Sequence, residues 1–162
     1  MPQYEGQCHC GQIAWTAEIP EEKHILCHCG ACKLMGGGEF TLNQIIPKDN
    51  FKLTKGDLKV YTYKGDSGNN TDCFMCPNCA SSPYHHQHVM GKVFHLLFLP
   101  SNVIFNCTNT NTILGEDKIV IRTGLLKGTE KWGKPAAEIY DKDRASWLPQ
   151  TGENSFPTVP PS

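Results

Sequence analysis

The stretch CHCGACK, residues 27–33, places three cysteines, Cys27, Cys29 and Cys32, within six positions. Cysteine thiolates are favoured zinc ligands, and a structural zinc site is closed by four ligands. Three thiolates are therefore one ligand short of such a site. We call these three residues the cysteine hook. A fourth ligand must come from elsewhere in the chain, or the fourth position stays open to a reactant.

Cysteine is frequent in this 162-residue chain, which holds nine, at positions 8, 10, 27, 29, 32, 73, 76, 79 and 107. Eight of them fall in clusters that are too tight for a ladder of disulfides. Clustered cysteines in a reducing compartment more often bind metal or carry redox chemistry. Cys107 stands apart, and we interpret it as a buried thiol that packs like a small hydrophobic residue. The clusters predict metal binding.

The spacing of the other cysteines predicts one closed zinc site. Cys8 and Cys10 form a C-x-C pair near the amino terminus, and Cys76 and Cys79 form the C-x-x-C pair of the sequence CPNC. Neither pair closes a tetrahedron alone, but together they provide four thiolates. Zinc bound there contributes to folding directly, on the order of 10 kcal/mol as metal-binding energy. No coordination position remains for catalysis at this site.

Two interpretations of the cysteine hook stay open at this point. A zinc with an open fourth position would lower the pKa of a bound thiol or water and so activate it. Alternatively, the hook is a second structural site whose fourth ligand comes from another side chain. The candidates for that ligand are Cys73, His28, His85, His86 and His88. Spacing alone does not separate the two interpretations.

Strand patterns dominate the rest of the chain. Apolar and polar residues alternate over 11–19 and 58–66, and β-rich runs occupy 92–100 and 118–126. The sequence contains no pattern typical of an amphipathic helix, although 128–148 could hold a short helical turn and a terminal strand. We therefore predict a mainly β fold, in a single zinc-binding domain over residues 1–149. The segment 150–162 is rich in proline and serine, which predicts a disordered tail.

Charge and hydropathy exclude several classes of partner. The net charge is −1, and Arg122 and Arg144 are the only arginines, so the basic stripe of a nucleic-acid-binding protein is absent. The amino-terminal sequence MPQYEGQCHCG lacks the basic and apolar regions of a signal peptide. The longest apolar stretch, VFHLLFLP, is too short to cross a bilayer. We predict a cytoplasmic protein with no nucleic-acid or membrane partner.

Three cysteine-containing segments carry a resemblance to a known family: GQCHCGQIAW (6–15), CHCGACKLMGGGEF (27–40) and CFMCPNCASSPY (73–84). In this order they resemble the glutathione-dependent formaldehyde-activating enzyme family, also called the GFA/CENP-V family. The closing segment up to about residue 149 is similar as well. One departure is Ala80, which stands where the family usually has a glycine after the second cysteine of the knuckle.

The resemblance implies a fold, two metal sites and a reaction. The fold is a β-tent of antiparallel sheets stapled by zinc, with two zinc ions per chain. The structural zinc would be bound by Cys8, Cys10, Cys76 and Cys79, in agreement with the spacing. The catalytic zinc would be bound by Cys27, Cys29 and Cys32, with a substrate sulfur or a water as its fourth ligand. Cys73 and Cys107 are then predicted to bind no metal.

The family's enzymes are carbon–sulfur lyases, which join glutathione to small electrophiles such as formaldehyde or separate the two. The resemblance thus implies a small-molecule thiol or thioether substrate, with glutathione as a co-substrate. One alternative is a non-catalytic zinc module that binds a protein, and another is an enzyme that catalyses elimination or isomerisation on a larger metabolite. The complete hook favours an enzyme, because a binding module needs only the four-cysteine site. Homo-oligomer formation is left open.

Other side chains near the motifs receive structural interpretations. His28 lies between two hook cysteines, and we expect it to stabilise the turn rather than to shuttle protons. Lys33 is interpreted as a surface lysine. Trp132 and Trp147 are interpreted as core or interface aromatic residues. The histidines at 85, 86 and 88 are expected in a solvated loop, from which one could reach the hook as a general acid or base.

Overall fold

The computed structural model describes residues 1–88 and 117–160. One short helix, α1 (Gly30–Gly36), and eleven strands form the described part of the chain. The strands are β1 (Gln3–Gln7), β2 (Ala14–Glu18), β3 (Ile25–Cys27), β4 (Thr41–Pro47), β5 (Phe51–Lys55), β6 (Lys59–Lys64), β7 (Asn70–Met75), β8 (Tyr84–Gln87), β9 (Lys118–Arg122), β10 (Ala137–Ile139) and β11 (Asn154–Phe156). Single 3₁₀ turns occupy Lys48–Asn50, Thr123–Leu125, Thr129–Lys131 and Asp141–Asp143.

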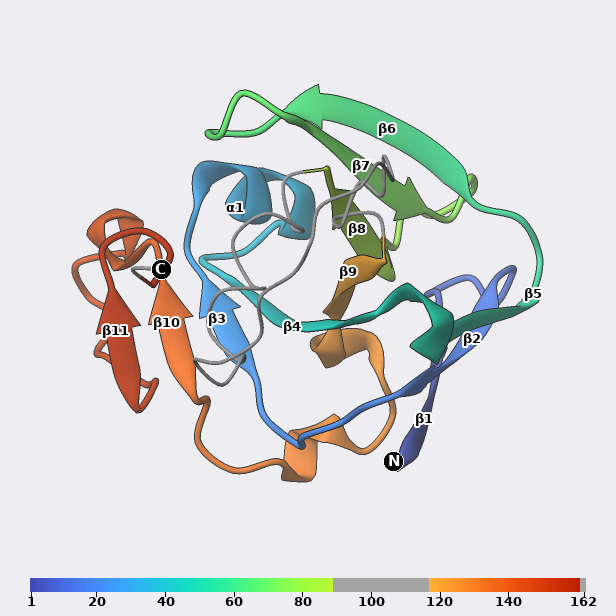
Figure 1. The fold of residues 1–162 in the computed structure, drawn as a ribbon, viewed down its shortest axis with the longest axis horizontal. Coiled ribbons are helices and arrows are strands. Elements are labelled where there is room, and N and C mark those ends of the chain that lie inside the picture. The colour runs from blue at the N-terminus through green and yellow to red at the C-terminus, as the bar shows by residue number, and fades with distance from the viewer. Residues whose placement is uncertain (89–116, 161–162) are drawn as a thin grey trace, which may run out of the picture.

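The strands form two sheets. The smaller sheet has the order β1-β2-β5, and the larger one has the order β11-β10-β3-β4-β9-β8-β7-β6. In Figure 1 the larger sheet runs from β11 at the left through β4 in the centre to β6 at the top, and the smaller sheet lies at the lower right. Most neighbouring strands are antiparallel, whereas β10 pairs in parallel with both β3 and β11.

The core lies between the two sheets. Along β2 the alternating residues Trp15 and Ala17 are buried, as the pattern over 11–19 predicts. They belong to one cluster with Ile46 of β4 and Ile121 of β9, and fully burying each such large apolar side chain contributes about 1.5–3 kcal/mol. One face of the larger sheet is therefore apolar and covered by the smaller sheet. Its opposite face is free to carry polar residues.

The structure confirms a mainly β fold built largely of antiparallel strands, and it corrects two local predictions. A helix not predicted from the sequence, α1, begins directly after the second cysteine of the hook. The tail predicted to be disordered instead contains β11, which pairs with β10 in register, Ala137 opposite Asn154. The sequence signal failed there because β11 is only three residues long and is held by backbone pairing, which composition does not reveal.

Some predictions fall outside the described residues, namely the strand at 92–100 and the buried thiol of Cys107. The strands predicted over 11–19, 58–66 and 118–126 correspond to β2, β6 and β9. Within residues 1–88 and 117–160, no helix has both the length and the apolar character needed to cross a membrane.

Candidate metal centres and active site

Four cysteines distant in sequence meet at one end of the small sheet. The sulfurs of Cys8, Cys10, Cys76 and Cys79 all lie within 4.8 Å of one another. The Sγ atoms of Cys8 and Cys10 are 3.5 Å apart, and those of Cys10 and Cys76 are 3.7 Å apart. A disulfide requires about 2 Å, whereas tetrahedral zinc with bonds of about 2.3 Å separates its sulfur ligands by about 3.8 Å. The spacing of these thiols thus fits a tetrahedral zinc ion.

Two tight turns present these sulfurs. The Cys8 turn is closed by a backbone hydrogen bond from the Gly11 N–H to the Cys8 carbonyl, at 3.0 Å. In the second turn, the Ala80 N–H donates to the Cys76 carbonyl at 3.0 Å. Ala80 has a φ of 60°, in the left-handed region that favours glycine. This geometry would suit a glycine, and alanine adopts the same turn at a cost in strain.

The cysteine hook lies where β3 ends and α1 begins. Cys27 is the last residue of β3, and Cys29 caps α1 by accepting a hydrogen bond from the Cys32 N–H, with an N···Sγ distance of 3.4 Å. The three sulfurs lie within 4.8 Å of one another. No further cysteine, histidine or carboxylate atom joins this group in the part of the chain that the structure describes. Six consecutive residues, 27–32, thus gather three sulfur ligands, and no other described residue provides a fourth ligand.

Contacts among the three sulfurs concentrate negative charge on Cys32. Hydrogen bonds from the thiols of Cys27 and Cys29 outweigh burial and, helped by the positive charge of Arg122, lower the pKa of Cys32 to about 2. The same contacts, together with burial, raise the pKa of Cys27. These contacts therefore favour the thiolate form at Cys32 over that at Cys27. A cation would release the other protons, since thiolates are the metal-binding form.

The sheet register places a row of polar residues beside the hook. Residues directly opposite each other on antiparallel strands share a face, as do residues two apart along one strand. Cys27 is opposite Thr41, Asn43 is opposite Arg122, and His85 is opposite both Val120 and Cys73. We call this side of the larger sheet the site face, defined by Cys27, Asn43, His85, Cys73 and Arg122.

Helix α1 covers part of the site face. Its Met35 lies 3.6 Å from the Cys73 sulfur, measured between the Sδ and Sγ atoms. Cys73 itself is buried, and its sulfur lies outside the 4.8 Å group formed by the hook sulfurs. The contact with Met35 and the burial of Cys73 agree with a packing role. Its predicted lack of metal stays a prediction.

The negative charge of the hook helps to raise the pKa values of two tyrosines, Tyr63 and Tyr140. Burial, followed by the negative charges of Cys73, Cys29 and Cys32, raises the pKa of Tyr63 to about 12. Burial, and then the charges of Asp66, Cys29 and Cys27, raises the pKa of Tyr140 to about 12. Both phenols keep their protons at neutral pH. As neutral phenols they can donate or accept hydrogen bonds, but they carry no phenolate charge with which to act as strong bases.

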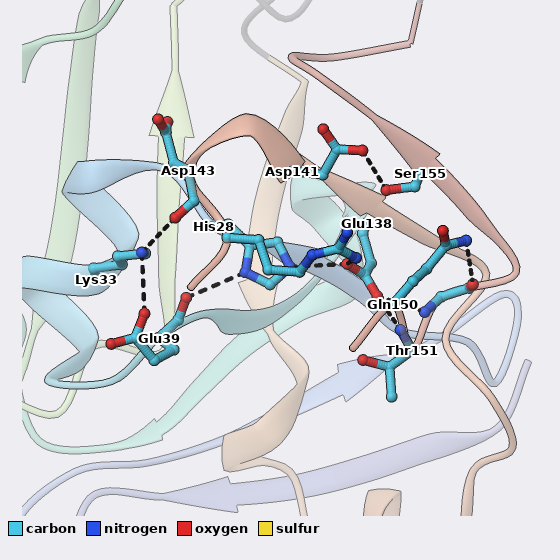
Figure 2. A network of polar contacts seen from close by, with 11 residues as sticks. His28, Lys33, Glu39, Glu138, Asp141, Asp143, Gln150, Thr151 and Ser155 are labelled. Atoms are coloured by element: carbon cyan, nitrogen blue, oxygen red, sulfur yellow. Dashed lines mark hydrogen bonds and ion pairs between the residues drawn. The ribbon is translucent and has the colours of Figure 1, made fainter. Parts of the chain in front are cut away.

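The His28 side chain lies in a buried polar network (Figure 2). It contacts Glu138 Oε2 at 3.1 Å through Nε2 and the Glu39 carbonyl at 3.2 Å through Nδ1. Glu138 also accepts hydrogen bonds from Arg144 at 3.0 Å, from the Gly152 N–H at 2.7 Å and from the Thr151 N–H. Both ring nitrogens are thus engaged, in agreement with the predicted turn-stabilising role of His28.

The network joins the hook to the carboxyl-terminal segment. Burial alone would raise the pKa of Glu138, but hydrogen bonds from Gly152, Thr151 and His28 lower it to about 2, so the carboxylate is charged. Lys33, predicted as a plain surface lysine, instead forms an ion pair with Glu39 at 3.0 Å and donates to the Asp143 carbonyl (Figure 2). These contacts explain how β11 and its flanking turns stay on the sheet.

The structure places the three histidines at 85, 86 and 88 in different surroundings. His85 and His86 lie on β8 and are buried, so the predicted solvated loop is wrong for these two. His85 lies on the site face, and burial, helped by the charge of Arg122, lowers its pKa to about 3. His86 lies on the opposite face of the sheet, where it approaches Asp72 and His88. Of the three, His85 is the one placed beside the hook, and it is neutral.

The two tryptophans predicted as core or interface residues, Trp132 and Trp147, differ in their burial. Trp132 packs on Tyr4 with ring centroids 5.2 Å apart and donates a hydrogen bond to its hydroxyl, which agrees with a core role. Trp147 is exposed.

Sequence reasoning missed Asn43 and Arg122, which the register places beside the hook. A signal existed for the arginine alone, because it is one of two in the chain and follows the apolar run of residues 119–121.

A sequence profile described as glutathione-dependent formaldehyde-activating enzyme matches residues 3–101, which is more than half of the chain. A curated relative from Schizosaccharomyces pombe, named an uncharacterized lyase, is 30% identical over 84 residues, or 52% of this chain. The match spans 58% of that relative's length. A crystal structure of a Rhodobacter sphaeroides protein superposes with a TM-score of 0.49 at 15% identity, covering 76% of this chain and 88% of that one.

Proposed function

The chain belongs to the glutathione-dependent formaldehyde-activating enzyme family, and from this premise we propose that it is a zinc-dependent carbon–sulfur lyase. The reaction makes or breaks a bond between a thiol such as glutathione and a small electrophile. The single observation that carries the proposal is the cysteine hook, whose three sulfurs lie together with no fourth ligand from the described residues.

The two cysteine sets suit different tasks. Cys8, Cys10, Cys76 and Cys79 offer four thiols at zinc spacing and would hold a structural ion. Cys27, Cys29 and Cys32 would hold the catalytic ion. When bound, that zinc would stabilise a substrate thiolate at neutral pH.

In the direction of bond formation, the sulfur electron pair of the thiol forms the carbon–sulfur bond to the carbonyl carbon. The carbonyl π electrons move to oxygen, which receives the proton that the thiol has lost. Cleavage is the reverse. Tyr63 is the candidate donor toward that oxygen, because its phenol stays protonated and accepts from Thr71 rather than donating, whereas the Tyr140 hydroxyl is already bonded to Asp66. The lyase name of the S. pombe relative agrees with this reaction class.

A thiol-release assay tests the proposal. Glutathione adducts of small aldehydes and other thioethers are incubated with the zinc-replete protein, and free thiol is measured with time. Wild type is expected to release thiol, and Cys32→Ser is expected to release none above background while keeping the four-cysteine site. Lys127→Met is the control, since it changes an exposed side chain outside the hook and the site face. Equal release by wild type and Cys32→Ser would refute the proposal.

A further inference from the structure

Two histidines and an aspartate gather on the face of the larger sheet that is opposite to the site face. Their ligand atoms, one each from Asp72, His86 and His88, lie within 4.8 Å of one another. His88 Nε2 is 2.8 Å from Asp72 Oδ2, and the two histidine rings have centroids 5.0 Å apart. The three side chains belong to neither group of cysteines. The proposed function therefore makes no use of them.

Strand pairing brings these three side chains together on β7 and β8, which lie side by side near the top of Figure 1. Asp72 on β7 is directly opposite His86 on β8, and His88 follows two residues later on the same side of the chain. The His88 N–H donates to the Asn70 carbonyl at 3.0 Å, which continues the pairing one residue beyond β8. His86 is only 9% exposed, so packing restricts its ring. The backbone thus positions the three donors before any ligand binds.

A threonine on the next strand orients the carboxylate. Thr62 on β6 is opposite Asp72, and its hydroxyl donates to Asp72 Oδ1 at 2.6 Å. The other carboxylate oxygen, Oδ2, is the one that approaches His88. Carboxylates that bind metal ions are commonly fixed by such an additional hydrogen bond. Asp72 shows the same division of its two oxygens between an orienting hydroxyl and the histidine cluster.

The donor set is the one that a transition-metal ion prefers. Imidazole nitrogen together with a carboxylate suits divalent ions such as zinc, whereas magnesium and calcium prefer ligand sets made of oxygen. Bonds of about 2.1 Å to one ion separate neighbouring ligand atoms by about 3.0 to 3.4 Å. The 2.8 Å between His88 and Asp72 is close to this separation. An ion pair between these two residues does not include the second imidazole, whereas a shared metal ion includes all three groups.

We propose that Asp72, His86 and His88 bind a divalent transition-metal ion such as zinc, at a third metal site separate from both groups of cysteines. The ion would connect β7 to β8. Three protein ligands leave at least one coordination position for water or another small ligand. Because the cluster and the hook lie on opposite faces of the sheet, the proposal does not depend on the proposed function.

Calorimetry on the full chain tests the proposal, after the cysteine sites have been loaded with zinc and excess zinc has been removed. Wild type is expected to bind one further equivalent of zinc and no magnesium at this site. Thr62→Val should weaken the binding of this zinc by at least about tenfold, as for other residues that orient a metal ligand. Asp72→Asn and His88→Gln should weaken it more, because each removes a ligand. Thr54→Val, at an exposed threonine of β5, is the matched control and should bind as wild type does.

Three results would overturn the proposal. One is the absence of a further zinc equivalent in wild type. Another is a further equivalent that Asp72→Asn and His88→Gln both bind with unchanged affinity, because that ion then lies elsewhere, for example at an unfilled hook. The third is equal binding of zinc and magnesium, which would indicate a carboxylate acting alone.

A measurement on wild type covers the case in which a variant does not fold. Added zinc is expected to shift the ring signals of His86 and His88 in the ¹H–¹⁵N spectrum of the histidine side chains. Ring signals of both histidines that stay unchanged while zinc binds would place the ion at another site and refute the proposal.

Discussion

Replacing Glu138 by glutamine tests whether the buried carboxylate holds the carboxyl-terminal segment to the hook. The Glu138 side chain is fully buried, and its two oxygens accept hydrogen bonds from Arg144, His28 and two backbone N–H groups. The fall of its pKa from an ordinary 4.5 to about 2 corresponds to about 3 kcal/mol at neutral pH, at about 1.4 kcal/mol for each pKa unit. Glu138→Gln is expected to lower the free energy of unfolding by this amount at pH 7.

The pH dependence of this effect has a definite sign. Because the folded-state pKa lies below the unfolded one, the charged carboxylate stabilises the fold above pH 4.5, and this stabilisation is lost as the pH falls from 4.5 toward 2. The difference between wild type and variant should therefore be constant from pH 7 to about 5. Below 4.5 it should shrink by about 1.4 kcal/mol for each pH unit. Both proteins also lose stability in acid through their cysteine sites. Because this loss is the same in both, it cancels in the difference between their free energies of unfolding.

Urea unfolding followed by tryptophan fluorescence provides the measurement. With a slope of about 2 kcal/mol per molar urea, the midpoint of Glu138→Gln should fall by about 1.5 M. Glu5→Gln is the matched control, since Glu5 forms an exposed ion pair with Lys127 and should contribute less than about 1 kcal/mol. A Glu138→Gln protein within about 0.5 kcal/mol of wild type at pH 7, or a difference unchanged at pH 3.5, would refute the reasoning.

Three further predictions concern the cysteine sites. Cys76→Ser should lose one equivalent of zinc and unfold more easily than wild type, measured by metal analysis and urea midpoint; wild-type stability would contradict the structural site. Replacing Cys73 and Cys107 together by serine should leave the zinc content unchanged, whereas loss of one equivalent would show that one of them completes the hook. Ala80→Gly should stabilise the protein by about 1 kcal/mol, because a left-handed φ of 60° strains alanine but not glycine. Ala145→Gly, at a residue without positive φ, should destabilise it instead.

Local patterns in the sequence determined much of the architecture. Alternation over 11–19 predicts a half-buried strand, and β2 indeed buries Trp15 and Ala17. The cysteine spacings predict two groups of thiols, and in the structure the sulfurs within each group lie close to one another. These signals succeed because a strand period and a tight C-x-x-C turn are properties of a few consecutive residues, so that each can be recognised without knowing the rest of the fold.

Only the tertiary structure decided what surrounds the hook. Arg122 meets Asn43 through the pairing of β9 with β4, and β10 joins β3 in parallel across more than one hundred residues of chain. Such register between distant strands leaves no local pattern, because it depends on how the sheets pack. The same reason hid β11, whose three residues follow a proline- and glycine-containing stretch and are held through Glu138. The sequence by itself thus predicted the two groups of thiols that could hold a metal, and the pairing of distant strands determined which polar residues lie beside them.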